Sequence, residues 1–127
     1  MHRVSIRTLF SHPIVRRLIL GGYVAAMLAA LLMPVPATPS FVPGDFDKVA
    51  HVGLFLGFGL LAAWNARGGR RSRALGAFAW AVALAGLTEA LQSLLPYRSG
   101  DPMDLVAGVA GAIIGAVLGA QSGTPTD

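Results

Sequence analysis

Eight polar side chains, seven of them acidic, basic or cationic and one an amide, lie in or beside the apolar segments of this chain. They form three groups along the sequence: Asp47, Lys48 and His51; Glu89 and Gln92; and Arg98, Asp101 and Asp104. Carboxyl and imidazole groups can exchange protons near neutral pH, and lysine and arginine bind phosphate or carboxylate anions. If the fold brings the three groups together, they supply the parts of an acid–base site or of a binding site for an anionic headgroup.

The composition indicates that these groups are surrounded by lipid. Of the 127 residues, 54% are hydrophobic and 13% are charged, whereas a soluble domain carries about 25% charged residues. Four apolar segments, residues 13–33, 49–66, 74–95 and 103–120, are each near the ~20 residues that a helix needs to cross a bilayer. They lack the alternating pattern of a membrane β-barrel. The sequence therefore predicts an all-α integral membrane bundle of four transmembrane helices.

Arginines flank two parts of this predicted bundle. They are Arg3, Arg7, Arg16 and Arg17 near the start of the first span, and Arg67, Arg70, Arg71 and Arg73 between the second and third spans. The positive-inside rule places both groups in the cytoplasm, and an even number of spans then returns the C-terminus there, so both termini are cytoplasmic. The net charge of +4 reflects this topology and attraction to anionic lipids, and we expect no nucleic acid partner.

The predicted domain organisation has three parts. A basic cytoplasmic arm (residues 1–12) precedes the transmembrane domain (13–120), and a short flexible tail (121–127) follows it. An alternative is that the basic start, the apolar run and Val35-Pro36-Ala37 form a cleavable signal peptide. The apolar run from residue 18 to residue 33 is longer than the roughly 7–15 residues usual for a signal core, which favours the four-span interpretation.

The predicted topology places the polar groups at one level of the membrane, at the outer ends of the second, third and fourth spans. Glu89 precedes the predicted end of the third span by six residues, or about 9 Å at ~1.5 Å per residue. A carboxylate inside the hydrocarbon costs about 2.5–3.5 kcal/mol on the lenient insertion scale. We therefore expect Glu89 to face the bundle and to be paired or protonated, with His51, Lys48 or Arg98 as its partner.

Glycines in two spans indicate close helix packing. They are Gly53 and Gly57 in the second span, and Gly111, Gly115 and Gly119 in the fourth. The spacing of four matches the pattern that lets membrane helices approach closely. Asp104 shares the face of Gly108, Gly111 and Gly115, so we expect it to point at neighbouring helices. The same glycine faces are compatible with a homo-oligomer.

Common motifs of cofactor and metal chemistry are not found in the sequence. The chain has no cysteine and three histidines, His2, His12 and His51, whose spacing is not that of a metal site. No HExxH, P-loop or GxSxG motif is present. The sequence therefore predicts neither a metal site nor a cofactor.

Three segments resemble the signatures of VanZ-like membrane proteins in order and spacing. DKVAHVGLFLGFG (47–59), EALQ (89–92) and RSGDPMDLVAGVAGAIIG (98–115) correspond to DKxxH, ExxQ and RxxxxxDxxxNxxGxxxG. The resemblance implies a small multi-pass protein of the bacterial cytoplasmic membrane, in a family named for a member associated with low-level teicoplanin resistance. It assigns the polar signature to Asp47, Lys48, His51, Glu89, Gln92, Arg98 and Asp104. Gly108 stands where the family has asparagine, which removes one hydrogen-bonding side chain.

Three functions remain open at this stage. An acid–base enzyme would use Glu89 and His51 as catalytic residues, with an anionic lipid headgroup as the substrate. A binding protein would recognise a cell-envelope lipid, a lipid-linked precursor or a lipophilic glycopeptide. A structural role would use interhelical hydrogen bonds worth about 0.6 kcal/mol each. We expect binding or modification of an envelope lipid, with an effect on glycopeptide susceptibility and with these binding residues: Asp47, Lys48, Gln92, Arg98, Asp101 and Asp104.

Overall fold

The computed structural model describes residues 6–34 and 45–122, and within these ranges the chain forms five α-helices and no strand. They are α1 (Ile6–Ser11), α2 (Pro13–Leu32), α3 (Phe46–Asn65), α4 (Arg70–Leu94) and α5 (Pro102–Gln121). Helices α2 to α5 are each long and apolar enough to cross a membrane, which confirms the four predicted spans. The possible cleavage site at Val35 to Ala37 lies outside the described residues.

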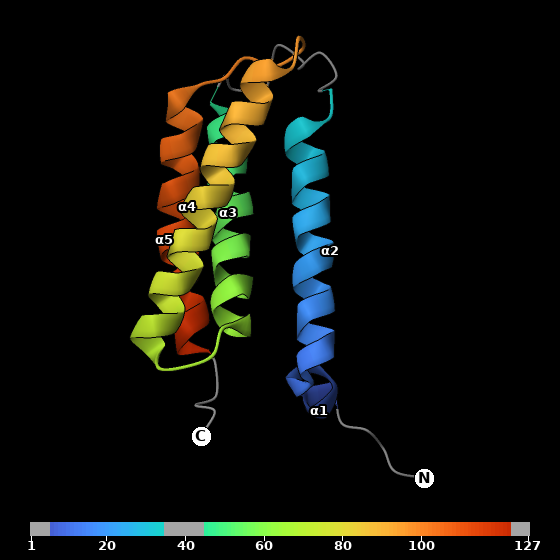
Figure 1. The fold of residues 1–127 in the computed structure, drawn as a ribbon, viewed down its shortest axis with the longest axis vertical. Coiled ribbons are helices and arrows are strands. Elements are labelled where there is room, and N and C mark those ends of the chain that lie inside the picture. Colours follow the sequence, from blue (N-terminus) through green and yellow to red (C-terminus); the bar gives the residue numbers. More distant parts are fainter. Residues whose placement is uncertain (1–5, 35–44, 123–127) are drawn as a thin grey trace.

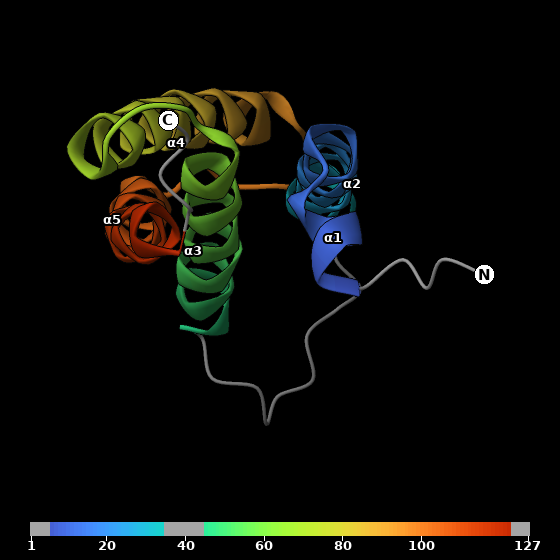
Figure 2. The same ribbon diagram turned by 90° about the horizontal axis from the view of Figure 1, so that it is seen from below.

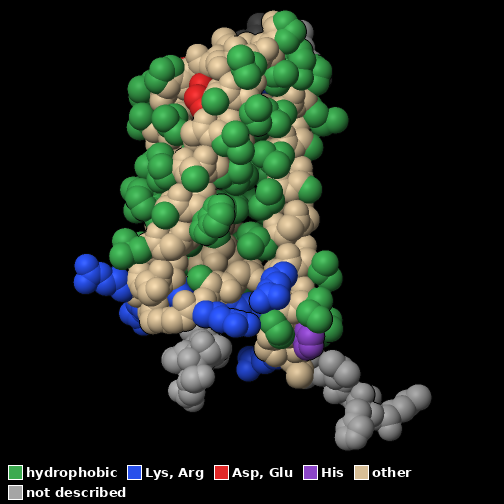
Figure 3. Space-filling model, in the orientation of Figure 1, with side chains coloured by type: hydrophobic (Ala, Val, Ile, Leu, Met, Phe, Trp, Pro, Cys, Tyr) green, Lys and Arg blue, Asp and Glu red, His purple; other side chains and the backbone are tan. Residues whose placement is uncertain are grey.

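The four long helices run alongside one another and alternate in direction (Figure 1). At one end of the bundle α2 and α4 finish and α3 and α5 begin; we call it the aspartate end, because Asp47, Asp101 and Asp104 lie there. We call the opposite end, where α2 and α4 begin, the arginine end. Figure 3 shows blue arginine side chains gathered at the arginine end of the face that it draws, with a red acidic side chain towards the other end.

The observed helix boundaries follow from local capping chemistry. Proline, which suits the first helical position, opens both α2 and α5. Asp101 caps α5 by accepting a hydrogen bond of 2.9 Å from the Met103 amide. Helices α3 and α4 begin at Phe46 and Arg70, before the predicted residues 49 and 74, because their charged first turns are helical without being apolar. Helix α1 lies in the basic arm, for which the sequence analysis did not predict any secondary structure.

Helices α3 and α5 form the closest pair, and glycines make this approach possible. A Cβ atom on Gly111 or Gly115 would overlap a backbone carbonyl oxygen of α3, which confirms the predicted packing face of α5. On α3 the matching glycine is Gly59, where a Cβ atom would lie 2.7 Å from the Ala112 carbonyl oxygen. Of the two other α3 glycines predicted to pack closely, Gly57 lies against Tyr23 of α2, whereas Gly53 has open space beside it.

Helix α2 stands beside α3 and α4 and away from α5 (Figure 2). It buries Met27 and Leu31. Side-chain hydrogen bonds join it to α3, to α4 and to the α4–α5 connection. The donor side chains are Tyr23 to the Leu54 carbonyl, Asn65 to the Arg16 carbonyl, Gln92 to the Leu31 carbonyl, Tyr97 to the Leu32 carbonyl and Arg98 to the Ala30 carbonyl. These contacts make α2 part of the bundle.

Arg73 joins the ends of α3 and α5 at the arginine end. Its side chain is buried and donates three hydrogen bonds of 3.1 Å, from Nε to the Ala63 carbonyl, from Nη1 to that of Ala120 and from Nη2 to that of Gly119. The last carbonyls of a helix have no partner within the helix, and a cation there is favoured by the helix dipole. Arg73 therefore stabilises the fold in addition to its predicted contribution to topology.

The outward surface of the long helices is apolar. Leu18, Trp80 and Leu94 are exposed to 70%, 72% and 79%, and hydrophobic side chains cover most of the face drawn in Figure 3. A soluble monomer rarely exposes a continuous apolar surface of this extent. Together with the length of the helices, this surface indicates an integral membrane protein.

Candidate functional site

Three of the predicted site residues meet at the aspartate end. Asp47 and His51 come from α3 and Asp104 comes from α5, and one ligand atom from each lies within 4.8 Å of the others. His51 is 2% exposed and Asp104 is 3% exposed, whereas the Asp47 side chain is 52% exposed. The group is therefore buried on one side and reaches the surface through Asp47.

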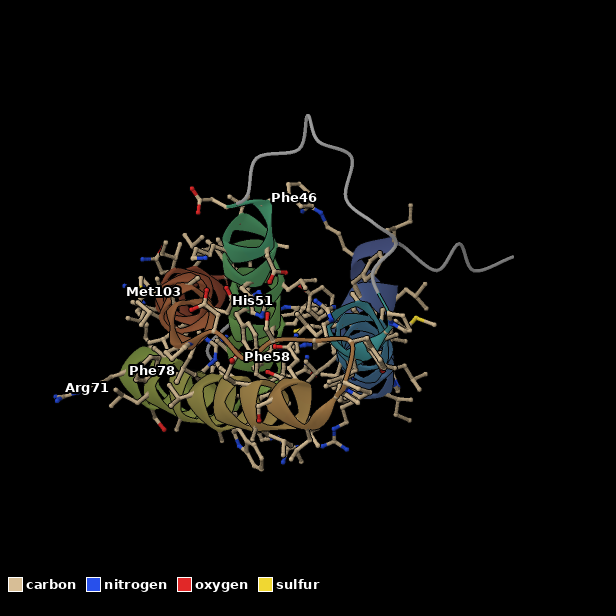
Figure 4. All side chains as sticks on the ribbon, turned by 90° about the horizontal axis from the view of Figure 1, so that it is seen from above. Phe46, His51, Phe58, Arg71, Phe78 and Met103 are labelled. Carbon is tan, nitrogen blue, oxygen red and sulfur yellow. The ribbon has the colours of Figure 1, made fainter. Side chains whose placement is uncertain are left out.

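The helix packing sets the position of this group. Asp47 and His51 lie on one face of α3 because they are four residues apart. The His51 ring is stacked near the buried Phe55 ring, with 6.4 Å between centroids, and Phe55 in turn occupies the space beside Gly108, where a Cβ atom would lie 2.9 Å from its Cδ2. Asp104 is one turn before Gly108 and so reaches the level of His51. Figure 4, which views this end from above, shows His51 on α3 beside α5.

The hydrogen bonds of His51 assign its tautomer. Nδ1 lies 2.9 Å from the backbone carbonyl oxygen of Asp47, and because a carbonyl only accepts, Nδ1 carries the proton. In neutral imidazole Nε2 then holds a lone pair. This atom and Oδ1 of Asp104 are both buried, and neither has a hydrogen-bond partner among the described residues. Two buried acceptors without a donor are uncommon in folded proteins, and this distinguishes His51 and Asp104 from the other buried polar side chains that are hydrogen-bonded.

Two cations lie at the edge of the group. Nζ of Lys48 contacts Oδ2 of Asp101 at 3.1 Å, and Nη1 of Arg98 lies 4.0 Å from Oδ1 of Asp47. The hydrogen bond from the Met103 amide and the contact with Lys48 lower the pKa of Asp101 below its usual value, so Asp101 is a carboxylate at neutral pH. Lys48 and Arg98 thus lie beside carboxylates at the exposed edge of the group.

Gln92 and Arg98 bind the end of α2. Gln92 is buried and its Nε2 donates a hydrogen bond of 2.8 Å to the Leu31 carbonyl, while Nη2 of Arg98 donates one of 3.1 Å to the Ala30 carbonyl. The hydroxyl of Tyr97 donates to the Leu32 carbonyl at 2.8 Å. These three side chains satisfy consecutive carbonyls at a helix C-terminus, which otherwise lack partners. This role of Tyr97 could not be predicted from the sequence, because its partner is a backbone group far away in the chain.

Glu89 lies outside the group formed by Asp47, His51 and Asp104. Its side chain is half-buried on α4, and Oε1 would be 3.1 Å from a Cβ atom placed on Gly100. Within residues 6–34 and 45–122 it makes no hydrogen bond or ion pair. The proton exchange between Glu89 and His51 therefore stays a prediction, and His51 is instead grouped with two aspartates.

The arrangement permits two kinds of chemistry. An imidazole nitrogen and carboxylate oxygens are ligands for divalent metal ions. The same imidazole, with Nδ1 held by a carbonyl and Nε2 bearing a lone pair, can accept a proton from a bound molecule.

Residues 5–120 match the sequence model of the VanZ/LLP1 family. The matched range contains all four spans and every candidate site residue, so the chain belongs to this family. The search of curated proteins and the search of solved structures return no match.

Proposed function

We propose that this VanZ/LLP1 family protein binds the headgroup of a cell-envelope lipid, or of a lipid-linked envelope precursor, at the aspartate end of its bundle. The observation that carries the proposal is the buried group of Asp47, His51 and Asp104, in which His51 Nε2 and Asp104 Oδ1 have no partner among the described residues. We place this end at the outer face of the bacterial cytoplasmic membrane, because the arginines at the other end favour the cytoplasm.

The contrast with Gln92 argues against a purely structural role for the group. Gln92 is buried and hydrogen-bonded to α2, as expected of a residue that joins helices. His51 and Asp104 are equally buried, yet each keeps an acceptor atom that joins nothing in the described chain. Interhelical hydrogen bonds stabilise a membrane bundle by only about 0.6 kcal/mol each. His51 Nε2 and Asp104 Oδ1 form no such bond in the described chain, so nothing there offsets the cost of burying them.

The position of the group suits a ligand that is itself anchored in the membrane. It lies in the first turns of α3 and α5, at the level where a span meets the headgroups. The side chains of Asp47, Lys48 and Asp101 are 52%, 34% and 41% exposed, so they form a polar rim. A lipid can present its headgroup to this rim while its chains contact the apolar surface of the helices.

A second candidate function is acid–base catalysis on the same headgroup. It is favoured by one observation: the carbonyl of Asp47 orients the His51 ring, which leaves Nε2 available as a general base. Glu89, half-buried on α4, is the second catalytic residue that the sequence predicts.

The two functions are distinguished by lipid analysis of whole membranes. We would express the wild type, His51→Gln and Ser93→Ala, an exposed control on α4, in a bacterium sensitive to glycopeptides. An enzyme changes the abundance of an envelope lipid or precursor in the wild type and the control, and His51→Gln abolishes the change. A binding protein leaves that composition unchanged.

Glycopeptide susceptibility measured in the same strains provides the functional readout. The wild type and Ser93→Ala are expected to reduce susceptibility to a lipid-tailed glycopeptide more than to one without a tail, and His51→Gln to lose this effect at equal protein level. Wild type and His51→Gln strains that are alike in both membrane lipids and susceptibility would contradict the proposal.

A further inference from the structure

We infer that Asp47, His51 and Asp104 bind a divalent transition-metal ion. The inference rests on the proposed function, because it concerns the same site and names the ion that would meet the headgroup there. It departs from the sequence-based prediction of no metal site. That prediction considered the spacing of histidines along the chain, whereas these ligands come from two different helices.

The distances fit a shared ion. One ligand atom from each of the three side chains lies within 4.8 Å of the other two, with either ring nitrogen counted for His51, and His51 makes no hydrogen bond or ion pair with Asp104 in the described structure. Tetrahedral ligands with metal–ligand bonds of about 2.0–2.2 Å lie about 3.4 Å apart. Side-chain movements of about 1 Å would therefore bring the three groups onto one ion.

The environment of the imidazole is that of a metal ligand. A histidine that binds a metal commonly donates its second ring N–H to a carbonyl or carboxylate, which fixes the ring and its tautomer. Nδ1 of His51 has such a partner in the Asp47 carbonyl at 2.9 Å. The remaining nitrogen, Nε2, is buried without a partner among the described residues, and so it presents its lone pair.

The charges of the group also favour a cation. Asp104 is 3% exposed and has no lysine or arginine partner in the described chain, and buried carboxylates are stable when they are paired or coordinate a metal. Lys48 is engaged by Asp101, and Arg98 approaches Asp47 only to 4.0 Å. A divalent ion would neutralise Asp47 and Asp104 together.

A metal ion would explain how a site rich in carboxylates receives an anionic headgroup. Three protein ligands leave at least one coordination position for an outside group, as in catalytic zinc sites. The exposed side of Asp47 leads to that position. A phosphate oxygen bound there would lie near Lys48 and Arg98, which bind phosphate in proteins.

Zinc binding by the purified protein tests the inference. The wild type, His51→Gln, Asp104→Asn and Asp45→Asn would be loaded with Zn²⁺ in detergent, freed of excess metal by gel filtration and measured by mass spectrometry of the element. Asp45→Asn is the control, because Asp45 is exposed and its side chain makes no capping bond. We expect about one zinc per chain in the wild type and the control, and a loss of at least about tenfold in the other two.

A thermal measurement keeps the test valid if a variant folds poorly. Zn²⁺ should raise the Tm of the wild type and of Asp45→Asn, because an ion that binds only the folded state stabilises it. A wild type that retains no zinc and whose Tm does not respond to zinc would overturn the metal site. Lipid bound in the same preparations would be counted separately. A protein that retains lipid but no zinc would contradict the metal site and leave the proposed headgroup binding intact.

A separate observation concerns the arginine end, and from it we infer a second site, for a phosphate group. Four arginines, Arg16, Arg17, Arg67 and Arg73, line a cavity of about 220 Å³ between α2, the α3–α4 connection and α4. Nε of Arg16 is buried there without a partner among the described residues, and its guanidinium is held 4.5 Å from the centre of the Trp64 ring.

The charge at this end has no counterpart in the described chain. The acidic residues described by the structure are Asp45, Asp47, Glu89, Asp101 and Asp104, and all lie in or near the ends of the helices at the aspartate end. Several guanidinium groups around one cavity repel one another unless an anion lies between them. Guanidinium groups bind phosphate through paired hydrogen bonds, and both lipid headgroups and soluble phosphates provide this group.

Two double variants with equal loss of charge test the phosphate site. Arg16→Gln/Arg17→Gln removes two arginines that line the cavity, while Arg70→Gln/Arg71→Gln removes two exposed ones that do not. Each protein would be placed in neutral lipid bilayers, and its Tm measured after adding phosphatidylglycerol or inorganic phosphate. We expect either ligand to raise the Tm of the wild type and the second variant but not of the first. A response to phosphatidylglycerol alone identifies a lipid, and a response to phosphate alone a soluble ligand. Equal responses of both variants, or none in the wild type, would overturn the site.

Discussion

Neighbouring polar residues at the aspartate end differ in whether their hydrogen-bonding atoms are satisfied. Gln92 donates to the Leu31 carbonyl of α2 and so holds two helices together, whereas Arg98 donates to the Ala30 carbonyl through Nη2 and keeps a buried Nε without a partner in the described chain. His51 and Asp104 are as well buried as Gln92, but each has an acceptor without a partner in the described chain. This difference separates Gln92, which stabilises the bundle, from His51 and Asp104, for which we propose a ligand.

The glycine at position 108 is explained by the ring of Phe55. A Cβ atom at this position would lie 2.9 Å from Cδ2 of Phe55, which is fully buried. We predict that Gly108→Asn, which restores the side chain expected from the family signature, lowers stability by roughly 1–3 kcal/mol because it overpacks this contact. Thermal unfolding in detergent measures the change.

A double variant provides the control for this prediction. Phe55→Leu makes space beside position 108, so Gly108→Asn should cost less in the Phe55→Leu background than in the wild type. Equal costs in the two backgrounds would show that Phe55 does not determine the residue at 108.

The contact between α3 and α5 depends on backbone approach at the α5 glycines. A Cβ atom on Gly115 would overlap the Leu56 carbonyl oxygen, whereas Ile114 points outward and is 49% exposed. We predict that Gly115→Leu destabilises the detergent-solubilised protein by more than about 3 kcal/mol, since backbone atoms cannot move aside as side chains do. Ile114→Leu should leave the Tm nearly unchanged. If the two variants unfold at the same temperature, this face is not a helix interface.

The arginine end depends on the hydrogen bonds of one buried side chain. We predict that Arg73→Ala lowers stability by about 3 kcal/mol, because three carbonyls at the ends of α3 and α5 lose a charged donor. The matched control is Arg71→Ala, which removes an exposed arginine of the same helix. Urea or thermal unfolding of both variants makes the comparison, and an equal loss in both would assign the effect to net charge.

The sequence predicted the helices better than their contacts. The four spans follow from apolar length, and the packing face of α5 follows from glycines repeated at one turn. The choice of Gly59 rather than Gly53 on α3 was not predictable, because α3 carries glycines on more than one face. The charged first turns of α3 and α4 were not predicted, because hydropathy identifies the apolar part of a helix and not the residue where the helix begins.

The candidate site was predictable only in part, for a related reason. Asp47 and His51 were paired correctly on one helix face by their spacing, and Asp104 was expected to point at neighbouring helices. The role of Gln92 was not predictable, because its partner is the Leu31 carbonyl, and every residue of a distant helix has a carbonyl. A backbone acceptor therefore cannot be identified from the sequence alone.

For the whole molecule, the separation of charges between the two ends predicts the orientation in the membrane. The arginine end should be cytoplasmic and the aspartate end outside. In this chain without cysteines, Ser40→Cys and Ser99→Cys should react with a membrane-impermeant thiol reagent in intact cells, and Ser72→Cys should react only after the membrane is opened. Labelling of Ser72→Cys alone in intact cells would reverse the orientation and place the site in the cytoplasm.

The central claim is that the group at the aspartate end binds a membrane-anchored headgroup, and the lipid that remains bound during purification tests it most directly. Wild type, Asp104→Asn and the exposed control Ser93→Ala would be purified in a mild detergent, and bound lipid counted by native mass spectrometry. Asp104→Asn keeps the size of the side chain and removes its charge. The account predicts one lipid species retained by the wild type and Ser93→Ala and lost from Asp104→Asn, with all three proteins folded. Folded preparations of all three that retain the same lipids, or no lipid at all, would contradict it.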